Sequence, residues 1–481
     1  MLDWKNKNYK AQQKYTSTTL STKSIDSLNT RLKKIYHTND IHGQFLKKLQ
    51  LLIFAYVSHR IPEISDTIKL IDDAMKAGFG WELGPFENWD IIGVKEIIQS
   101  MKENQISYAP WVDEMLAEGN NSFYKIEQGN VICYDISLKK YATSIEKIKT
   151  IILNNVRADK TVWKNSGCSI LDIGDDVLCV EFQTKLNAIG GEVIEGINKA
   201  IDMATDQYRG IVLGNNAPHF SAGANLAMIF MLAIEQEYEE LSMIIRQFQN
   251  TVMRLRHASI PIVAAPHGLT LGGGCEIVMH CDAAIIHSET YAGLVEVGVG
   301  LIPAGGGTKE MALRITDKAN SGDPILPLLG ERFTNIATAK TSTSAHEGFD
   351  LGIFDSLKDK IVMNLDFQIS FAKDEVLRLS RNGYTAAKQR DDIMVMGKSG
   401  LSGLYAGLAG FEIGNYASEY DIKIAKKLAW VICGGDLSMP TKVTEQYLLD
   451  LEREAFLSLL GEKKTLERIE HMLKTGKPLR N

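Results

Sequence analysis

The chain of 481 residues has few of the features that mark secreted, metal-binding or membrane-spanning proteins. It has only six cysteines, and no two of them are spaced as C-x-x-C. That spacing argues against a disulfide framework and against a zinc knuckle. No run of about 18 uncharged apolar residues occurs, which excludes a conventional transmembrane helix. The first residues contain no apolar segment of the secretory type, so we expect a soluble, cytoplasmic protein.

An excess of positive charge is also missing. Lys and Arg number 53 and Asp and Glu number 59, which gives a formal net charge of −6. Without a broad positive field, nucleic acid is not expected as a partner, and no membrane partner is expected either. What the sequence does have is 45% hydrophobic residues. At about 100–200 residues per domain, this length predicts two to four packed domains.

Composition and periodicity divide the chain into four segments. Residues 1–40 are polar, and we expect a flexible lead-in. Residues 41–165 carry apolar side chains at helical spacing, which predicts a helical domain. Residues 166–360 alternate short apolar strands with helices, which predicts an α/β unit whose consecutive strands are neighbours. Residues 361–481 have helical patterns to the end of the sequence.

Glycine clusters occur at three places, and their contexts differ. Gly397, Gly400 and Gly403 lack the preceding strand that a dinucleotide fingerprint needs, so we interpret them as a loop. Residues 272–274 are all glycine, follow a predicted strand and precede a helical pattern. Their backbone N–H groups would lie at the positive end of the helix dipole, which suits a carbonyl oxygen that gains negative charge. A close contact between helix and strand is the alternative interpretation.

A second loop with small residues spans residues 219–226, again between a predicted buried strand and a helix. Two backbone donors that converge on one oxygen make an oxyanion hole, whereas one donor makes only a hydrogen bond. His219 precedes the small residues of this loop and has no carboxylate partner that the sequence reveals. We therefore interpret His219 as a loop residue and not as a base.

Two acidic residues stand in otherwise apolar segments. Glu276 is three residues beyond Gly273, and Glu296 lies in a run with no other charge between Glu289 and Lys309. A buried acid is costly unless it is solvated, paired or protonated. If both acids face one cavity, their pKa values are driven apart, and one becomes a base and the other an acid. For Glu276 the alternative is a carboxylate that interacts only with its own helix N-terminus.

Cysteine and histidine residues near Glu276 could be taken for a metal site. Cys275 and Cys281 lie close in sequence to His280 and Asp282. Metal ligands must converge on one point, and this spacing does not require that. We interpret the cysteines as small buried residues of a helix, and no metal site is predicted.

Taken together, these segments resemble the crotonase, or enoyl-CoA hydratase, superfamily. Residues 261–276 are similar to its central motif, 219–226 to its first oxyanion loop, and 296–308 to its second acidic motif. Residues 184–188 resemble the segment that holds the adenine and pantetheine of coenzyme A. The resemblance implies a crotonase-like ββα spiral core within an α/β fold, an acyl-CoA thioester as substrate, and no cofactor for hydration.

The site residues follow from that resemblance. It implies that Glu276 and Glu296 hold a water molecule, with Glu276 as the ionised acceptor and Glu296 as the acid, although the two roles could be exchanged. It also implies that the backbone N–H groups of Ala222 and Gly273 bind the thioester oxygen. The substrate-binding residues that it implies are Lys185, Leu186, Asn187, Ala188, Gly223 and Ala224.

The flanking segments narrow the resemblance. Residues 71–90 resemble the helical C-terminal domain of 3-hydroxyacyl-CoA dehydrogenases, and 464–481 resemble the end of bacterial fusions in which a dehydrogenase precedes a hydratase. The NAD-binding domain of those proteins has no counterpart here, so NAD is not expected to bind this chain alone. The resemblance therefore implies the C-terminal portion of a bifunctional β-oxidation protein that hydrates trans-2-enoyl-CoA, and self-association is expected.

Two other interpretations stay open. The chain could be one half of a 3-hydroxyacyl-CoA dehydrogenase that acts with a separate NAD-binding subunit. It could also be an inactive relic that still binds acyl-CoA.

Overall fold

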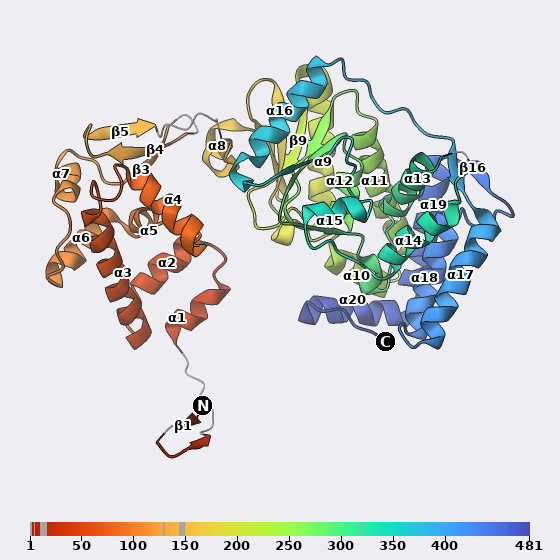
Figure 1. Ribbon diagram of the computed structural model, residues 1–481, viewed down its shortest axis with the longest axis horizontal. Helices are drawn as coiled ribbons and strands as arrows, with labels where there is room; N and C mark the ends of the chain where they lie inside the picture. The colour runs from red at the N-terminus through yellow and green to blue at the C-terminus, as the bar shows by residue number, and fades with distance from the viewer. Residues whose placement is uncertain (1, 4, 10–16, 128–129, 144–149, 321) are drawn as a thin grey trace. The chain divides into compact units, whose positions relative to one another are not determined.

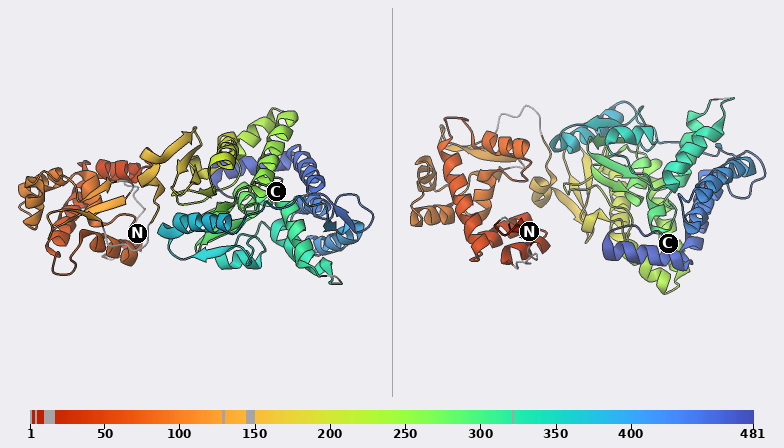
Figure 2. Two further views of the ribbon diagram at one scale, coloured as in Figure 1. Left: turned by 90° about the horizontal axis from the view of Figure 1, so that it is seen from above. Right: turned by 60° about the horizontal axis from the view of Figure 1, so that its bottom comes forward.

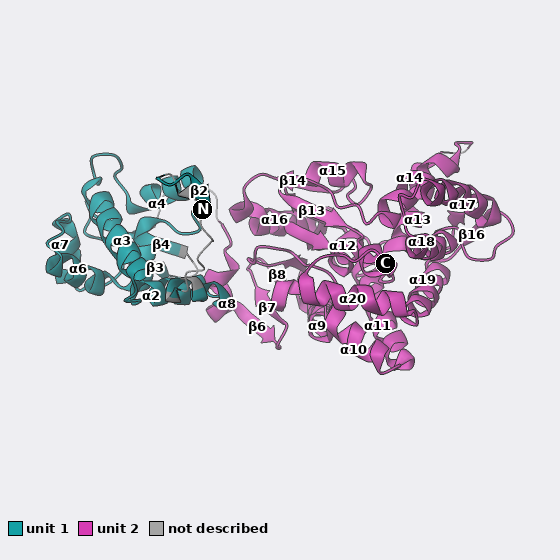
Figure 3. Ribbon diagram, turned by 90° about the horizontal axis from the view of Figure 1, so that it is seen from below, with its two compact units in different colours: residues 1–147 teal, residues 148–481 magenta. Residues whose placement is uncertain are grey.

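The computed structural model describes residues 2–3, 5–9, 17–127, 130–143, 150–320 and 322–481. These residues form two compact units, 1–147 and 148–481, each with its own apolar core (Figure 1, Figure 3). Within the described parts of the chain, every helix is too short or too polar to cross a bilayer. All six cysteines are buried and free.

The first unit combines helices with one small sheet. Its helices are α1 (Thr18–Ser21), η1 (Thr22–Ser24), α2 (Leu28–Tyr36), α3 (Ile41–His59), α4 (Ile68–Phe79), α5 (Pro85–Ile92), α6 (Val94–Glu103) and α7 (Trp111–Ala117). Its strands are β1 (Leu2–Asp3) and β2 (Asn8–Tyr9), which pair with each other, and β3 (Tyr124–Glu127), β4 (Asn130–Asp135) and β5 (Lys140–Thr143). Stacked and edge-on rings of Phe86, Trp89 and Phe123 fill the centre of this unit. The antiparallel sheet β3-β4-β5 lies in a segment that we predicted to be helical.

The flexible lead-in predicted for residues 1–40 is wrong where α2 is concerned. Tyr36 at the end of α2 is 1% exposed, and its hydroxyl donates to Oγ of Ser100 on α6 at 2.8 Å. Helix α2 also packs against α3 and α5. The sequence did not indicate this helix because it is mostly polar, and Tyr36 is its buried residue. Residues 10–16 of the predicted lead-in lie outside the described residues.

A buried carboxylate organises the loop between α4 and α5. Asp72 is fully buried, and its two oxygens accept from the backbone N–H groups of Phe86 and Glu87, both at 2.9 Å. Its Oδ2 also accepts from the hydroxyl of Tyr124 at 2.9 Å. The carboxylate thus binds the free N–H groups at the start of α5, where a negative charge also complements the helix dipole.

The second unit is built on a seven-stranded sheet in the order β14-β12-β10-β9-β8-β7-β6. Its strands are β6 (Thr161–Lys164), β7 (Cys168–Asp172), β8 (Val177–Phe182), β9 (Gly210–Gly214), β10 (Ile262–Ala264), β12 (Ala283–His287) and β14 (Lys360–Val362). The pairs β6–β7 and β7–β8 are antiparallel, and the other pairs are parallel. A separate two-stranded parallel sheet joins β11 (Gly268–Leu271) to β13 (Thr290–Gly293). Consecutive strands of the large sheet are neighbours, as the sequence predicts.

Both faces of the large sheet are covered. Helix α9 (Gly191–Gln207) packs against β7, β8 and β9, and helix α16 (Gln368–Arg381) packs against β9, β10 and β12. Along β9, Ile211 and Leu213 belong to the core with α9, while Val212 belongs to the core with α16. Burial on both faces explains why these strands are continuous apolar runs. Helix α16 therefore belongs to the α/β unit, although we predicted a separate helical region from residue 361.

The boundary between the two units lies before the predicted one at residue 165. Helix α8 (Leu153–Lys160) and strand β6 belong to the second unit. Leu153 is fully buried in that unit's core. Arg157 pairs with the buried Glu181 on β8, its Nη2 and Nε donating at 2.6 and 2.9 Å.

Helices of the remaining chain complete the second unit. They are α10 (Leu226–Ile234), α11 (Tyr238–Arg256), α12 (Gly273–Met279), α13 (Gly307–Lys318), α14 (Ile325–Ala337), α15 (Ala345–Asp350), α17 (Gly397–Ile413), α18 (Glu419–Ile432), α19 (Glu445–Leu460) and α20 (Lys463–Thr475). Short 3-10 turns are η2 (Lys185–Asn187), η3 (Glu296–Val299) and η4 (Leu365–Phe367), and a further antiparallel pair joins β15 (Ile393–Val395) to β16 (Thr441–Val443). The last helix, α20, packs against α10 (Figure 2).

The glycines at 397, 400 and 403 lie in helix α17, which corrects the predicted loop. Leu404 and Leu408, one turn apart, are buried on this helix and hold it against the unit. The backbone N–H groups of Gly397 and Lys398 donate to Cys433 O and Leu437 O at 2.9 and 2.8 Å. These groups are therefore not free to bind a pyrophosphate.

Candidate active site

The two short parallel strands β11 and β13 bring the predicted acids to one edge. Leu271 and Gly293 are partners in their register, so both strands end side by side. Helix α12, with Glu276 in its first turn, follows β11, and η3, with Glu296 as its first residue, follows β13. The N–H of Gly272 donates to Gly293 O at 2.9 Å and ties the two exits together.

The loop at 219–225 lies against β11 at the same edge. Ser221 forms an isolated parallel bridge with Thr270, in which Ser221 N–H donates to Leu269 O and Leu271 N–H donates to Ser221 O, both at 3.0 Å. The small-residue loop and the glycine turn after β11 are therefore adjacent, as the sequence pattern requires for two converging donors.

One of the two predicted N–H donors, Ala222, is bonded within the fold. The Ala222 N–H donates to Leu186 O at 3.1 Å and is already occupied. In the described part of the chain, the N–H groups of Ala224 and Gly273 have no protein acceptor. A Cβ built on Gly273 would lie 3.6 Å from the nitrogen of Ala224, so these two backbones are close neighbours. Ala224, which we predict among the substrate-binding residues, thus has the free N–H group beside Gly273.

The predicted coenzyme A segment runs along the same loop. Ile189 and Ala224 form an isolated parallel bridge, and the side-chain Nδ2 of Asn187 donates to His219 O at 2.9 Å. Leu186 has a left-handed φ of 54° and a side chain that is 58% exposed. Lys185 is also exposed, whereas Ala188 is half-buried. The segment thus combines an exposed face with a backbone fixed against the 219–225 loop.

Glu276 is held by a glycine turn. It is 3% exposed, and its Oε1 accepts from the N–H groups of Gly305 and Gly307, both at 2.8 Å. Burial raises the pKa of Glu276 to about 7, against the opposing effect of those two N–H groups and of the Lys309 ammonium. An acid with such a pKa can both accept and release a proton near neutrality.

Glu296 lies beside the turn at Gly272, and one of its carboxyl oxygens has no hydrogen-bond partner among the described residues. A Cβ built on Gly272 would lie 3.0 Å from Oε1 of Glu296. Its Oε2 is buried and has no hydrogen-bond partner among the described residues. Burial raises the pKa of Glu296 well above its usual range, and the nearby charge of Glu276 adds to the effect. The two carboxyl groups therefore titrate as an interacting pair.

Other residues near Glu276 carried weaker sequence signals. Phe248 on α11 packs over the glycine turn, since a Cβ on Gly273 would lie 3.4 Å from its Cζ, and a Cβ on Gly305 would overlap its ring. Glu452 on α19 is fully buried and binds the same turn. The sequence signal for Glu452 was only an acid within the apolar stripe of a helix, which we did not use.

The remaining titratable groups that we weighed have structural partners. His219 Nδ1 accepts from the Leu269 N–H at 3.2 Å. His280 is buried, with Nδ1 2.6 Å from Glu276 O and Nε2 2.9 Å from Nζ of Lys309. Within the described residues, no cluster of histidine, cysteine, aspartate or glutamate is arranged to hold a metal ion.

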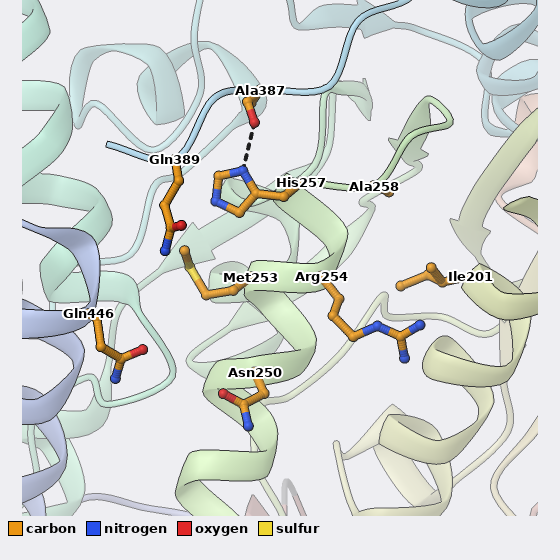
Figure 4. Close-up of a pocket in the computed structure, with 9 residues that line it drawn as sticks. All are labelled: Ile201, Asn250, Met253, Arg254, His257, Ala258, Ala387, Gln389 and Gln446. Atoms are coloured by element: carbon orange, nitrogen blue, oxygen red, sulfur yellow. Dashed lines mark hydrogen bonds between the residues drawn. The ribbon is translucent and has the colours of Figure 1, made fainter. Parts of the chain in front are cut away.

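A polar hollow of about 700 Å³ lies elsewhere in the second unit, at the C-terminal end of α11 (Figure 4). Arg254 and His257 of α11 line it together with Gln389 and Gln446. His257 Nδ1 lies 2.7 Å from Ala387 O, and Arg254 Nη1 donates to Asn198 Oδ1 at 2.6 Å. None of the predicted site residues lines this hollow.

Comparison with known proteins finds relatives of the segment that contains Glu276 and Glu296. Residues 172–322 match the family described as enoyl-CoA hydratase/isomerase. The chain is 41% identical over 460 residues to the "Probable 3-hydroxyacyl-CoA dehydrogenase" of Bacillus subtilis (strain 168), a match that covers 95% of this chain and 57% of that relative. The chain thus spans little more than half the length of the curated relatives that it matches first.

Solved structures of enoyl-CoA hydratases are also similar. The one from Bacillus halodurans has 17% sequence identity and a TM-score of 0.43, and the match covers 63% of this chain and 99% of that one. The one from Mycobacterium avium subsp. paratuberculosis K-10 has 17% identity and a TM-score of 0.41, and the match covers 66% of this chain and 99% of that one.

The family match lies wholly within the second unit and includes Glu276, Glu296 and the glycine turn at 305–307. Residues 172–322 are therefore similar to the enoyl-CoA hydratase/isomerase family. The predicted fold class, an α/β crotonase-like core flanked by helical regions, is confirmed.

Proposed function

We propose that the second unit hydrates trans-2-enoyl-CoA to 3-hydroxyacyl-CoA. The observation that carries the proposal is the position of Glu276 and Glu296, two interacting buried acids at the edge where the N–H groups of Ala224 and Gly273 are free. When two such donors bind the thioester oxygen of an enoyl-CoA, the C2=C3 bond of the substrate is polarised toward attack at C3. Each donor of this kind stabilises the developing oxyanion by about 3 kcal/mol.

The two acids divide the proton transfers. Glu276, whose pKa is raised to about 7, is the ionised group that takes a proton from water as the water oxygen bonds to C3. Glu296, whose pKa is raised well above its usual range by burial and by the charge of Glu276, is protonated and delivers its proton to C2. The net change is addition of one water across the double bond, and no redox cofactor takes part.

We also expect isomerisation of a 3-enoyl-CoA as a side reaction of the same groups. It needs one carboxylate to move a proton and the same pair of N–H donors. The presence of both Glu276 and Glu296 favours hydration as the main reaction, because hydration uses two acids.

Crotonyl-CoA tests the proposal directly. The purified chain should remove the absorbance of the enoyl-thioester band. Glu276→Gln and Glu296→Gln should each lose most of this activity while still binding an acyl-CoA. Undiminished turnover in both variants would show that the acids were wrongly assigned. Binding of acyl-CoA by the wild-type chain without turnover would instead support the inactive relic.

A second candidate follows from the Bacillus subtilis relative, whose name describes a 3-hydroxyacyl-CoA dehydrogenase. The glycine-rich segment at 397–403 does not offer an NAD site, because the N–H groups of Gly397 and Lys398 donate within the fold. A dehydrogenase role would therefore need a separate NAD-binding partner. NAD reduction with 3-hydroxyacyl-CoA, assayed with and without such a partner from the host, separates this role from hydration.

A further inference from the structure

The turn that opens α13 offers four backbone N–H groups, and two buried acids share them. Gly305 and Gly307 donate to Oε1 of Glu276, both at 2.8 Å. Gly306 donates to Oε2 of Glu452 at 2.8 Å, and Lys309 donates to Oε1 of Glu452 at 2.6 Å. The donors alternate along the chain, so a shift of the turn away from Glu452 also shifts the N–H groups that hold Glu276.

Glu452 reaches the turn from a helix that is distant in sequence. It is fully buried on α19, which packs against α11 and α13. Gln249 on α11 strengthens this connection, because its Nε2 donates to Ala304 O at 2.9 Å and to Leu449 O at 2.8 Å. The residue before the turn and the turn itself are therefore both tied to α19.

The three glycines leave the turn without side chains of its own at positions 305–307. Gly306 has a φ of 102°, a backbone conformation that residues other than glycine rarely adopt. A Cβ there would lie 2.9 Å from the ring of His280. A Cβ on Gly307 would lie 2.9 Å from Oε1 of Glu276. Glycine has no side chain to anchor the turn, so its main anchors are the two carboxylates, which accept four of its N–H groups. The hydroxyl of Thr308 adds one bond to Pro303 O at 3.3 Å.

The electrostatic setting of Glu452 differs from that of a surface helix cap. Glu276 on α12 and Glu296 on η3 repel its charge, and Lys309 on α13 attracts it. Burial and the charge of Glu276 raise the pKa of Glu452 well above its usual range. An acid that is costly to bury and lies beside two others is a poor choice if only helix stability is needed.

We propose that Glu452 is a positioning residue for hydration, which fixes the 305–307 turn so that Glu276 meets the reacting water in the correct place. The proposal rests on the proposed function, because its activity readout is that reaction. Glu452 acts through the turn, and the structure gives it no contact with the N–H groups of Ala224 and Gly273.

Two substitutions and one control test it. Glu452→Met removes both acceptors and should lower kcat by about 100-fold while KM changes by less than about threefold, because the loss is in orientation and not in thioester binding. Glu452→Gln keeps one acceptor oxygen and should recover part of the loss, to about tenfold below wild type. Glu454→Gln, an exposed acid on the same helix, should match wild type.

A thermal melt with and without acyl-CoA shows whether each variant is folded and still binds. If folded Glu452→Met has a wild-type kcat, or if only its KM changes, Glu452 does not position the catalytic acid. If Glu452→Met does not fold, Glu452→Gln decides the matter, since equal kcat values for it and for wild type overturn the proposal.

A crystal structure separates failure of this inference from failure of the proposed function. If wild type itself has no hydratase activity, the proposed function is wrong. In that case the positioning role is judged from crystals of Glu452→Gln or Glu452→Met. We expect Gly305 and Gly307 to lie beyond hydrogen-bond distance of Glu276 in Glu452→Met, and unchanged bonds there would overturn the role.

Discussion

Gly272 and Glu296 are in contact across the ends of two neighbouring strands, so that a Cβ on Gly272 would lie 3.0 Å from Oε1 of Glu296. Gly272 also has a left-handed φ of 49°. Position 272 therefore links the backbone that presents the Gly273 N–H to the carboxyl group that we assign as the acid.

Gly272→Ala should reduce hydration at least tenfold. Strain at a positive φ costs about 1–2 kcal/mol, and relief of the close contact would displace Glu296 or the turn. The measurement is kcat/KM with crotonyl-CoA. Gly330→Ala is the matched control, because no atom lies within 4 Å of a Cβ at that position and it should retain full activity. Equal activity in both variants would show that Glu296 tolerates displacement.

The pH profile of hydration should be bell-shaped. The rate should rise with pH as Glu276 loses its proton, with its midpoint near the pKa of about 7. It should fall again at alkaline pH when Glu296, whose pKa is raised well above its usual range, loses the proton it must donate. The check is kcat/KM with crotonyl-CoA across both limbs, and a profile with no acidic limb would contradict the assignment of Glu276.

Because the pKa of Glu276 is raised in the folded state, the free energy of unfolding should fall as pH rises. The folded state holds the proton between the ordinary pKa of 4.5 and about 7, whereas the unfolded state releases it. The contribution of Glu276 to stability is therefore greatest below that window and decreases as pH rises through it. Glu276→Gln should flatten this part of a plot of unfolding free energy against pH, as measured by urea denaturation.

Arg157→Met should destabilise the second unit by about 3 kcal/mol, because it leaves the carboxylate of Glu181 buried without its ion pair. The side chain of Glu181 is only 2% exposed. Urea denaturation followed by circular dichroism measures the loss. The double variant Arg157→Met/Glu181→Met should regain most of it, since both charges are then gone. A neutral single variant would mean that α8 is not held by this pair.

Asp72→Asn should lower the stability of the first unit by about 1–3 kcal/mol. Asn has a single acceptor oxygen, and its NH₂ group would face the N–H of Phe86 or Glu87, which now donate to the two carboxylate oxygens. Asp73→Asn, at a half-buried position on the same helix, removes only partly exposed ion pairs with Lys69 and Lys76 and should cost less than about 1 kcal/mol. Similar losses for the two variants would argue against a capping role for Asp72.

Much of the second unit was predictable because its signals are local. Strands such as β8 and β9 are buried on both faces and mostly apolar, and each is followed along the chain by a turn or a helix that the sequence marks clearly. The acids Glu276 and Glu296 could be singled out because burying a charge within an apolar segment is costly unless the charge has a function or a partner. Helix α2 was missed because its sequence is polar and its stability comes from a few buried contacts. The sheet β3-β4-β5 was missed although β4 contains four apolar residues in a row, because its neighbours β3 and β5 mix polar and apolar residues.

The details of the site could not be predicted, because they depend on partners far away in the chain. Whether Ala222 or Ala224 has a free N–H is decided by the carbonyl of Leu186, which occupies the first of them. The pairing of β11 with β13 rests on two four-residue strands that have no alternating pattern. Nothing near Glu452 in the sequence indicates that its acceptors serve amides at 306 and 309.

The bond between Gly306 and Glu452 spans 146 residues. During synthesis, the strands of the large sheet leave the ribosome long before α19 does. A nascent chain can therefore assemble its scaffold while the amides of the glycine turn still lack one of their two acceptors. Reactivity would then be the last property the protein acquires, and a protease that removed α19 and α20 would abolish it while leaving every strand of the large sheet in the chain.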